Sequence, residues 1–171
     1  SITTVTFCVR RLQSAGWLRH KLAADEKRLP FALRVSTDPA AEVPLADIVA
    51  TATTSETPVL QGNWLKSGAH VDLVGAYTVS MREVDDNTLQ RGALYVDCSD
   101  TTVDHIGELV IPLAIGVIEH DSVVGDLYDL IAQGTGDGGR IRDSQQIAIF
   151  KNGGGAHRDL MVAHHLMTLS N

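Results

Sequence analysis

Apolar and polar positions along this chain fall into short blocks that predict strands and helices in turn. Two apolar runs, Ile48 to Ala52 and His70 to Val74, have the length of buried strands and are bounded by turn residues. Four further runs rich in β-branched or aromatic residues also predict strands: Ile2 to Val9, Phe31 to Val35, Ala93 to Asp97 and Gln146 to Lys151. We expect the sheet to bury seven apolar side chains: Val5, Ile48, Val49, Val71, Leu73, Leu94 and Val96.

Helical spacing of apolar residues fills most of the stretches between these strands. The predicted helices are Leu12 to Arg28, Asp85 to Arg91, Thr101 to Leu109, Gly125 to Gln133 and Ala156 to Leu169. Strands that alternate with helices are typical of an α/β fold in which helices flank a mostly parallel sheet.

Small and hydroxylic residues follow the two buried runs. Thr53-Thr54-Ser55 ends the first run, and Val74-Gly75-Ala76 ends the second. At the carboxyl ends of parallel strands, such residues let a ligand approach the backbone and offer donors to phosphate, ribose or amide groups. The pattern predicts a ligand site, and the alternative is a pair of strand-ending turns that bind nothing.

Composition and charge narrow the class of partner. The 171 residues are 44% hydrophobic and 20% charged, which suits a globular domain with a core. A formal net charge of −7 argues against nucleic acid or an anionic membrane as a partner. The longest apolar run, Leu109 to Ile118, is shorter than the ~18 residues of a membrane span. With only Cys8 and Cys98 and no basic-then-apolar leader, we expect a reduced, cytoplasmic setting.

Two other patterns predict no site. Gly134 to Gly139 matches G-x-G-x-x-G, but a helix precedes it and a polar run follows, so we interpret it as a surface loop. His157 and His164 share a helical face and His165 points elsewhere, without the i, i+4 spacing or acidic partner of a metal site. We expect surface histidines and no bound metal.

An ordered set of short segments runs along the chain: ADIVATATTS, PVL, GNWLKSGAH, VGA, REVDD, ALYVD, GEL, GDLYDLI, GR, IAIFK and DL. In order and spacing this set resembles the ornithine cyclodeaminase/mu-crystallin family, from about Val5 to Ala163. Family members are longer, and the chain resembles only their second part. The resemblance implies a Rossmann-like sheet, an NADP or NAD cofactor, a small amino-acid or cyclic imine substrate, and a homodimer in the full-length form.

On this resemblance the first βα unit of the Rossmann-like sheet, with its Gly-rich turn, is absent. In the order 3-2-1-4-5-6 that first strand is central, and its turn holds the pyrophosphate. We expect residues 1–145 to form a partial dinucleotide-binding domain. Residues 146–171 would be a strand and a helix that return towards a missing substrate and dimerisation domain. A fragment of a longer protein is the favoured interpretation, and a sheet that closes in another way is the alternative.

Arg10 and Arg11 follow the first strand, and no acidic residue occurs between Ile2 and Lys21. An acid at this strand end binds the ribose 2′-hydroxyl of NAD, whereas an Arg accommodates the 2′-phosphate of NADP. Arg10 falls on the position of a family Arg, so the resemblance implies NADP. The alternative is a solvated pair of charges.

The resemblance also assigns the strand ends. It implies that Thr53-Thr54-Ser55 and Val74-Gly75-Ala76 line the dinucleotide. It further places Asn152, where the family carries a Ser, near the nicotinamide. An amide can still donate and accept hydrogen bonds there.

Tyr77 is the departure from the family that bears on chemistry. Cyclodeaminases of the family carry an Asp directly after the VG-small segment, as the proposed acid/base or amine-orienting group, and the mu-crystallin branch lacks it. A tyrosine phenol, with an ordinary pKa of about 10, stays protonated near pH 7 and cannot serve as a carboxylate. We predict imine (ketimine) reduction rather than cyclodeamination, with Tyr77 as a neighbour of the substrate and no catalytic residue assigned.

Three interpretations of the chain's function stay open. The chain could belong to an oxidoreductase or cyclodeaminase-like enzyme, to a non-catalytic protein that binds NADP or a small ligand, or to an inactive truncated product. We expect no turnover from the isolated chain.

Glu83, Asp85 and Asp86 are expected to cap the helix that follows them. The last helix is expected to cause self-association through a broad, mostly apolar surface formed by Leu160, Met161, His164, Leu166 and Met167.

Overall fold

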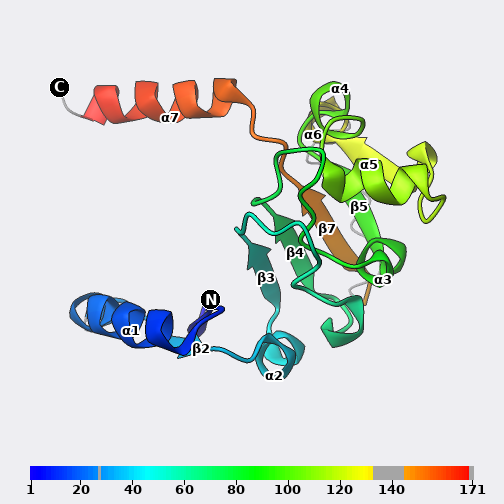
Figure 1. Cartoon of the computed structure of the whole chain (residues 1–171). Helices are drawn as coiled ribbons and strands as arrows, with labels where there is room; N and C mark the ends of the chain where they lie inside the picture. The colour runs from blue at the N-terminus through cyan, green and yellow to red at the C-terminus, as the bar shows by residue number, and fades with distance from the viewer. Residues whose placement is uncertain (27, 133–144, 170–171) are drawn as a thin grey trace. The chain divides into compact units, whose positions relative to one another are not determined.

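The computed structural model describes residues 1–26, 28–132 and 145–169 of the chain. The chain divides into two compact units, Ser1–Ala46 and Asp47–Asn171, and Figure 1 shows the elements of each. Within the described ranges, no helix is both long and apolar enough to cross a membrane. The Gly134 to Gly139 segment, predicted to be a surface loop, lies outside the described residues.

The N-terminal unit combines a pair of parallel strands with one long helix. Its elements are β1 (Thr4–Cys8), α1 (Leu12–Glu26), β2 (Ala32–Ser36), α2 (Pro39–Glu42) and the 3-10 turn η1 (Val43–Leu45). In the β1–β2 pair, Thr4 lies opposite Ala32 and Cys8 lies opposite Ser36. The predicted strand–helix–strand order of this unit is confirmed.

The second unit contains a five-stranded parallel sheet. Its elements are β3 (Ile48–Thr51), η2 (Gly62–Trp64), β4 (His70–Leu73), α3 (Asp86–Arg91), β5 (Gly92–Val96), α4 (Ser99–Thr102), α5 (Gly107–Ala114), η3 (His120–Ser122), β6 (Val123–Asp126), α6 (Leu127–Ala132), β7 (Ile147–Lys151) and α7 (Ala156–Leu169). The strand order is β3-β4-β7-β5-β6, with β7 in the middle (Figure 1). The predicted α/β fold with a mostly parallel sheet is confirmed. The boundary between residues 145 and 146 stays a prediction.

The core of the second unit surrounds its three middle strands. Four of the predicted core residues are at most 1% exposed: Val71, Leu73, Leu94 and Val96. On β7, Ile147 and Ile149 are also buried. Because side chains alternate along a strand, Lys151 shares the buried face of these two isoleucines.

Strand β3 is the edge of this sheet, and it corrects one prediction. Ile48 is 60% exposed, so the prediction that it is buried is wrong. Val49 and, in the other unit, Val5 are only half-buried. Within the described ranges β3 pairs with β4 alone, so one side of β3 has no neighbouring strand to cover it.

The gap expected in a Rossmann-like order stays a prediction. The described strands form two separate sheets, β1-β2 and β3-β4-β7-β5-β6. In the Rossmann order the first strand lies between the strands that β1 and β3 resemble. The described residues supply no strand for that position.

Two predicted helices differ markedly from the structure. The segment Thr101 to Leu109 is not one helix, because α4 ends at Thr102 and α5 begins at Gly107. The Gly107 N–H donates to the Thr78 carbonyl at 2.8 Å, and a side chain at Gly107 would collide with the backbone of Val79. This close contact fixes the chain between the two helices.

The other helix was predicted to begin at Gly125 and begins at Leu127. Gly125 and Asp126 instead belong to β6, which pairs with β5. The Asp126 carboxylate accepts hydrogen bonds from the N–H groups of Tyr128 and Asp129, at 2.9 and 3.1 Å. These contacts begin α6 directly after the strand.

Candidate functional site

The carboxyl ends of β3, β4 and β7 lie side by side. The Val74 N–H donates to the Thr51 carbonyl at 2.9 Å, and the Asn152 N–H donates to the Leu73 carbonyl at 3.0 Å. The structure therefore brings three predicted site segments to one edge of the sheet: Thr53-Thr54-Ser55, Val74-Gly75-Ala76 and Asn152.

A buried carboxylate, Glu83, joins the ends of β3 and β4. Glu83 is fully buried. On the β3 side it accepts hydrogen bonds from the Thr51 hydroxyl (2.8 Å), the Thr53 N–H (2.6 Å) and the Thr53 hydroxyl (2.8 Å). On the β4 side it accepts bonds from the N–H groups of Gly75 (2.8 Å) and Ala76 (3.2 Å). Five donors satisfy the charge that burial would otherwise penalise.

Gly75 lets these two strand ends approach each other. A Cβ atom at this position would lie 2.2 Å from both the backbone nitrogen and the backbone oxygen of Thr53. It would also lie 2.4 Å from a carboxylate oxygen of Glu83. Only a residue without a side chain fits this contact, so Gly75 is required by packing between the two strand ends.

The contacts of Glu83 change which hydroxyls can face a ligand. The Thr53 hydroxyl donates to Glu83, and the Ser55 hydroxyl donates to the Thr57 carbonyl at 2.6 Å. Thr54 is exposed. Of the three predicted hydroxyls, that of Thr54 is therefore the one best able to donate to a ligand.

Lys151 ends β7 with its ammonium group buried beneath the same edge. Its Nζ donates to three backbone carbonyls, of Leu73 (3.0 Å), Ala76 (2.7 Å) and Asn152 (2.8 Å). Burial lowers the pKa of Lys151 below its ordinary value, and the charges of Glu108 and Glu83 oppose that shift. The three carbonyls satisfy all three N–H groups of an ammonium.

Glu108, at the start of α5, supports the segment that carries Glu83. Its carboxylate accepts hydrogen bonds from the N–H groups of Glu83 (2.8 Å) and Val84 (3.0 Å). Burial raises the pKa of Glu108, while these two hydrogen bonds and the charge of Lys151 act in the opposite direction. Glu108 thus fixes the backbone of Glu83, and Glu83 fixes the strand ends.

The three acids expected to cap α3 have different roles. Asp85 is the N-cap, since its carboxylate accepts a bond from the Thr88 N–H at 2.9 Å. Asp86 lies in the first turn and pairs with Arg82. The prediction for Glu83 is wrong, because its carboxylate binds the ends of β3 and β4 instead.

Tyr77 follows the held segment and is 63% exposed. Its phenol stands where a cyclodeaminase of the family would carry a carboxylate. Val74, on the same segment, is 43% exposed. The edge thus offers backbone, a hydroxyl, an amide and a phenol to a ligand, and these groups suit a dinucleotide better than a multiply charged ion.

Arg10 and Arg11 lie in the N-terminal unit, after β1, and both are exposed. They follow the strand end at which the sequence predicts recognition of a 2′-phosphate. Their role in cofactor choice stays a prediction.

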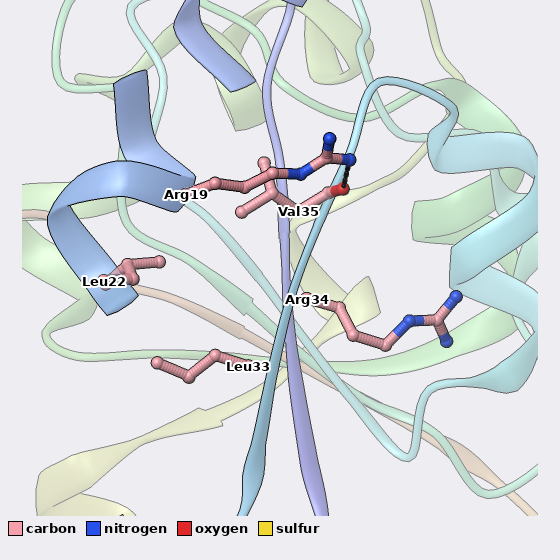
Figure 2. Close-up of a pocket in the computed structure, with 5 residues that line it drawn as sticks. All are labelled: Arg19, Leu22, Leu33, Arg34 and Val35. Carbon is pink, nitrogen blue, oxygen red and sulfur yellow. Dashed lines mark hydrogen bonds between the residues drawn. The ribbon is translucent and has the colours of Figure 1, made fainter. Parts of the chain in front are cut away.

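A shallow pocket in the N-terminal unit contains none of the predicted site residues. Its lining comes from α1 and β2, namely Arg19, Leu22, Leu33, Arg34 and Val35. Figure 2 shows the Arg19 guanidinium directed at the Val35 carbonyl, to which it donates at 2.8 Å, and Arg34 directed away from the two leucines. Arg34 pairs with Glu42 instead. The pocket therefore presents no group of converging donors for a ligand.

Sequence reasoning missed the three buried charges of this edge. For Lys151 a signal was present, because the IAIFK pattern puts Lys151 in register with Ile147 and Ile149. No comparable signal marked Glu83, which looked like a helix-capping acid. For the part of the chain that is described, no group of three or more His, Cys, Asp or Glu residues could hold a metal ion.

Comparisons with known proteins show the family of the chain. The model of the ornithine cyclodeaminase/mu-crystallin family matches residues 10–168. A Delta(1)-pyrroline-2-carboxylate reductase of Paracoccus denitrificans is 48% identical over 166 residues, which cover 96% of this chain and 50% of that protein. Ketimine reductase mu-crystallin of Mus musculus is 30% identical over 118 residues, which cover 69% of this chain and 34% of that protein.

A solved structure shows the same fold over nearly the whole chain. It is Thermococcus litoralis Delta(1)-pyrroline-2-carboxylate reductase in complex with NADH and L-proline. It aligns with a TM-score of 0.82 at 25% identity, over 95% of this chain and 48% of that one. The chain thus spans about half the length of these two reductases, each of which matches nearly all of this chain.

Proposed function

The chain belongs to the ornithine cyclodeaminase/mu-crystallin family, and on that basis we propose that it forms the dinucleotide-binding part of an NAD(P)H-dependent imine reductase. The substrate class is a small cyclic imine that carries a carboxylate. Two reductases named for such a substrate support this class, one by 48% sequence identity and one by its fold.

Tyr77 is the observation that carries the choice of reaction. Cyclodeamination oxidises an amine and expels ammonia, so it needs a proton acceptor beside the reacting carbon and nitrogen. The exposed residue after the Val74-Gly75-Ala76 segment is a phenol and not a carboxylate. Reduction of a cyclic imine needs no proton acceptor at this position, because the substrate can arrive already protonated on nitrogen.

The residues at the sheet edge fit the cofactor. Gly75 lets the ends of β3 and β4 approach each other, the Thr54 hydroxyl can donate, and the amide of Asn152 lies at the end of the middle strand. In the N-terminal unit, taken by itself, Arg10 and Arg11 follow a strand end and have the charge that suits a 2′-phosphate. When bound, a reduced nicotinamide supplies the hydride. The chain's own part is to position the cofactor, with Tyr77 as a neighbour of the substrate.

The test uses the protein encoded by the complete reading frame that contains this chain. It is offered a cyclic ketimine with NADPH, and separately ornithine with NAD(P). We expect NADPH oxidation with the imine and no ammonia release from ornithine. The Tyr77→Phe variant keeps the ring and removes the hydroxyl, and we expect it to retain imine reduction.

Two results would decide against this proposal. Ammonia release from ornithine that survives Tyr77→Phe would mean that another residue supplies the base. Tight NADPH binding without turnover of any imine would favour the second candidate, a protein that binds NADP or a small ligand without catalysis.

We also propose a cytoplasmic homodimer for the complete protein. The free thiols of Cys8 and Cys98 suit a reducing compartment. The exposed apolar side chains of α7, which include Leu160 and Met161, suit a subunit interface.

A further inference from the structure

Lys151 is the buried charge that the proposed reaction does not use. Its side chain is fully buried at the end of the middle strand. Its ammonium group donates to the carbonyls of Leu73, Ala76 and Asn152, all within 3.0 Å. One cation thus joins the end of β4, the segment after β4, and the residue after β7.

These bonds fix how the backbone presents itself at the sheet edge. The Ala76 carbonyl is directed at Lys151, and it shares the planar, trans Ala76–Tyr77 peptide group with the N–H of Tyr77. The N–H of Tyr77 therefore points in the opposite direction. The carbonyl of Asn152 is held by the same ammonium, while its side-chain oxygen accepts a bond from the Gly154 N–H at 2.8 Å. Two neighbouring segments of the candidate site are thereby oriented by one buried group.

Glu83 binds the N–H groups of the segment whose carbonyl groups Lys151 binds. It accepts the N–H groups of Gly75 and Ala76, whereas Lys151 accepts none and binds the Ala76 carbonyl. The donors of this segment thus face an anion, and its acceptor faces a cation. The segment between Leu73 and Tyr77 has little freedom to rotate.

We propose that Lys151 is a positioning residue, which holds the Ala76–Tyr77 peptide and Asn152 in the arrangement that receives the nicotinamide end of the cofactor. The inference rests on the proposed function, because that function puts a dinucleotide at this edge. Lys151 itself is covered and reaches the ligand only through the backbone that it orients.

A positioning role and a merely structural role predict different binding patterns. If Lys151 only stabilises the fold, its loss weakens all ligands of the folded protein alike or none of them. If it orients Ala76 and Asn152, its loss weakens binding of the nicotinamide half alone. NADPH and 2′-phospho-ADP-ribose separate these cases, because the second compound lacks the nicotinamide ring.

The experiment compares Lys151→Met with Lys66→Met in the protein from the complete reading frame. Methionine keeps the length of the lysine stem and removes the donors. Lys66 is a matched control, since it forms a partly exposed ion pair with Asp47 at 2.5 Å. Dissociation constants for NADPH and 2′-phospho-ADP-ribose are measured by calorimetry, and folding is checked by circular dichroism.

We expect Lys151→Met to weaken NADPH binding at least tenfold and to leave 2′-phospho-ADP-ribose binding within twofold of the wild type. Lys66→Met should change neither constant. Lys151→Gln, which keeps two donors, should give an intermediate loss and serves if the methionine variant does not fold.

Several results would overturn the inference. Unchanged NADPH binding, or an equal loss for both ligands, would make Lys151 structural only. Unfolding of both variants would have the same meaning. If the wild type binds neither compound, the proposed function itself fails. If the wild type binds both compounds and the variants bind them equally well, only the inference about Lys151 fails.

Discussion

Two buried residues of opposite charge organise the strand ends in complementary ways. Glu83 collects N–H and hydroxyl donors, and Lys151 collects carbonyl acceptors. A buried charge is tolerated only when such partners replace the water that it loses. Removal of one partner leaves the buried charge with the full free-energy cost of desolvation. At this scale the site depends on individual polar contacts more than on apolar packing.

Arg10 carries the prediction of cofactor preference. In the protein from the complete reading frame, NADP(H) should bind more tightly than NAD(H). Arg10→Ala should reduce that preference by about 1–3 kcal/mol, the range for loss of a charge-assisted hydrogen-bond partner. Fluorescence titration with NADPH and NADH measures the difference. Arg28→Ala, which removes another exposed arginine of the same unit, is the control. Equal titration curves for both cofactors in the wild type would contradict the prediction.

The residues of the site were predictable from sequence to different degrees. The small residues at Thr53-Thr54-Ser55 and Val74-Gly75-Ala76 were predicted to follow two neighbouring strands, and the structure places them side by side, because strand-end chemistry is local. The direction of the Thr53 hydroxyl was not predictable, since it donates to Glu83, 30 residues further along the chain. A contact of that kind arises only when the fold brings the two segments together.

At the scale of elements, the approach of β3 and β4 depends on Gly75. The Gly75→Ala substitution should lower the free energy of unfolding by about 1–3 kcal/mol, the usual cost of forcing extra atoms into a packed site. The backbone of Thr53 cannot move aside without breaking its bond to Glu83. Urea unfolding followed by circular dichroism measures the change.

Gly16→Ala provides the matched control for this substitution. Gly16 lies in α1, and a Cβ there would meet no atom within 4 Å. Alanine should therefore be neutral or stabilise the helix by up to about 1 kcal/mol. A Gly75→Ala variant as stable as the wild type would show that the two strand ends separate at no cost.

Element boundaries were predicted well where the pattern was local and poorly where a tertiary contact sets them. The ends of α7 follow from the apolar spacing and agree with the prediction, Ala156–Leu169. The start of α5 depends on the contact of Gly107 with the Thr78 carbonyl, which no periodicity reveals. Strand β6 was missed because its apolar part is only Val123 and Val124, and its pairing with β5 defines it.

At the scale of the whole chain, strand–helix alternation was enough to predict the α/β class. The Rossmann-like order came from the resemblance to a family. Alternation did not predict that Ile48 is exposed, because burial at an edge strand depends on which strand lies beside it. In the described residues β3 pairs with β4 alone, and β1 and β2 form a sheet of their own.

Helix α7 leads to the last prediction, that the chain self-associates. Its described side chains are all exposed, among them Leu160 at 71% and Met167 at 70%. An isolated helix of 14 residues is marginally stable in water, so this helix needs a partner surface for its apolar side chains. Light scattering should give a mass above the 18.4 kDa of one chain.

A double substitution, Leu160→Lys with Met167→Lys, should shift the scattering mass towards that of one chain, because charged side chains oppose burial of this surface. Leu12→Lys is the matched control, since Leu12 is 76% exposed on α1 and lies outside α7. If α7 provides the contact, the control keeps the wild-type mass while the double variant loses it. A wild type that scatters as a monodisperse monomer would mean instead that α7 packs onto its own sheet, and its apolar side chains would then be protected from water without a second copy.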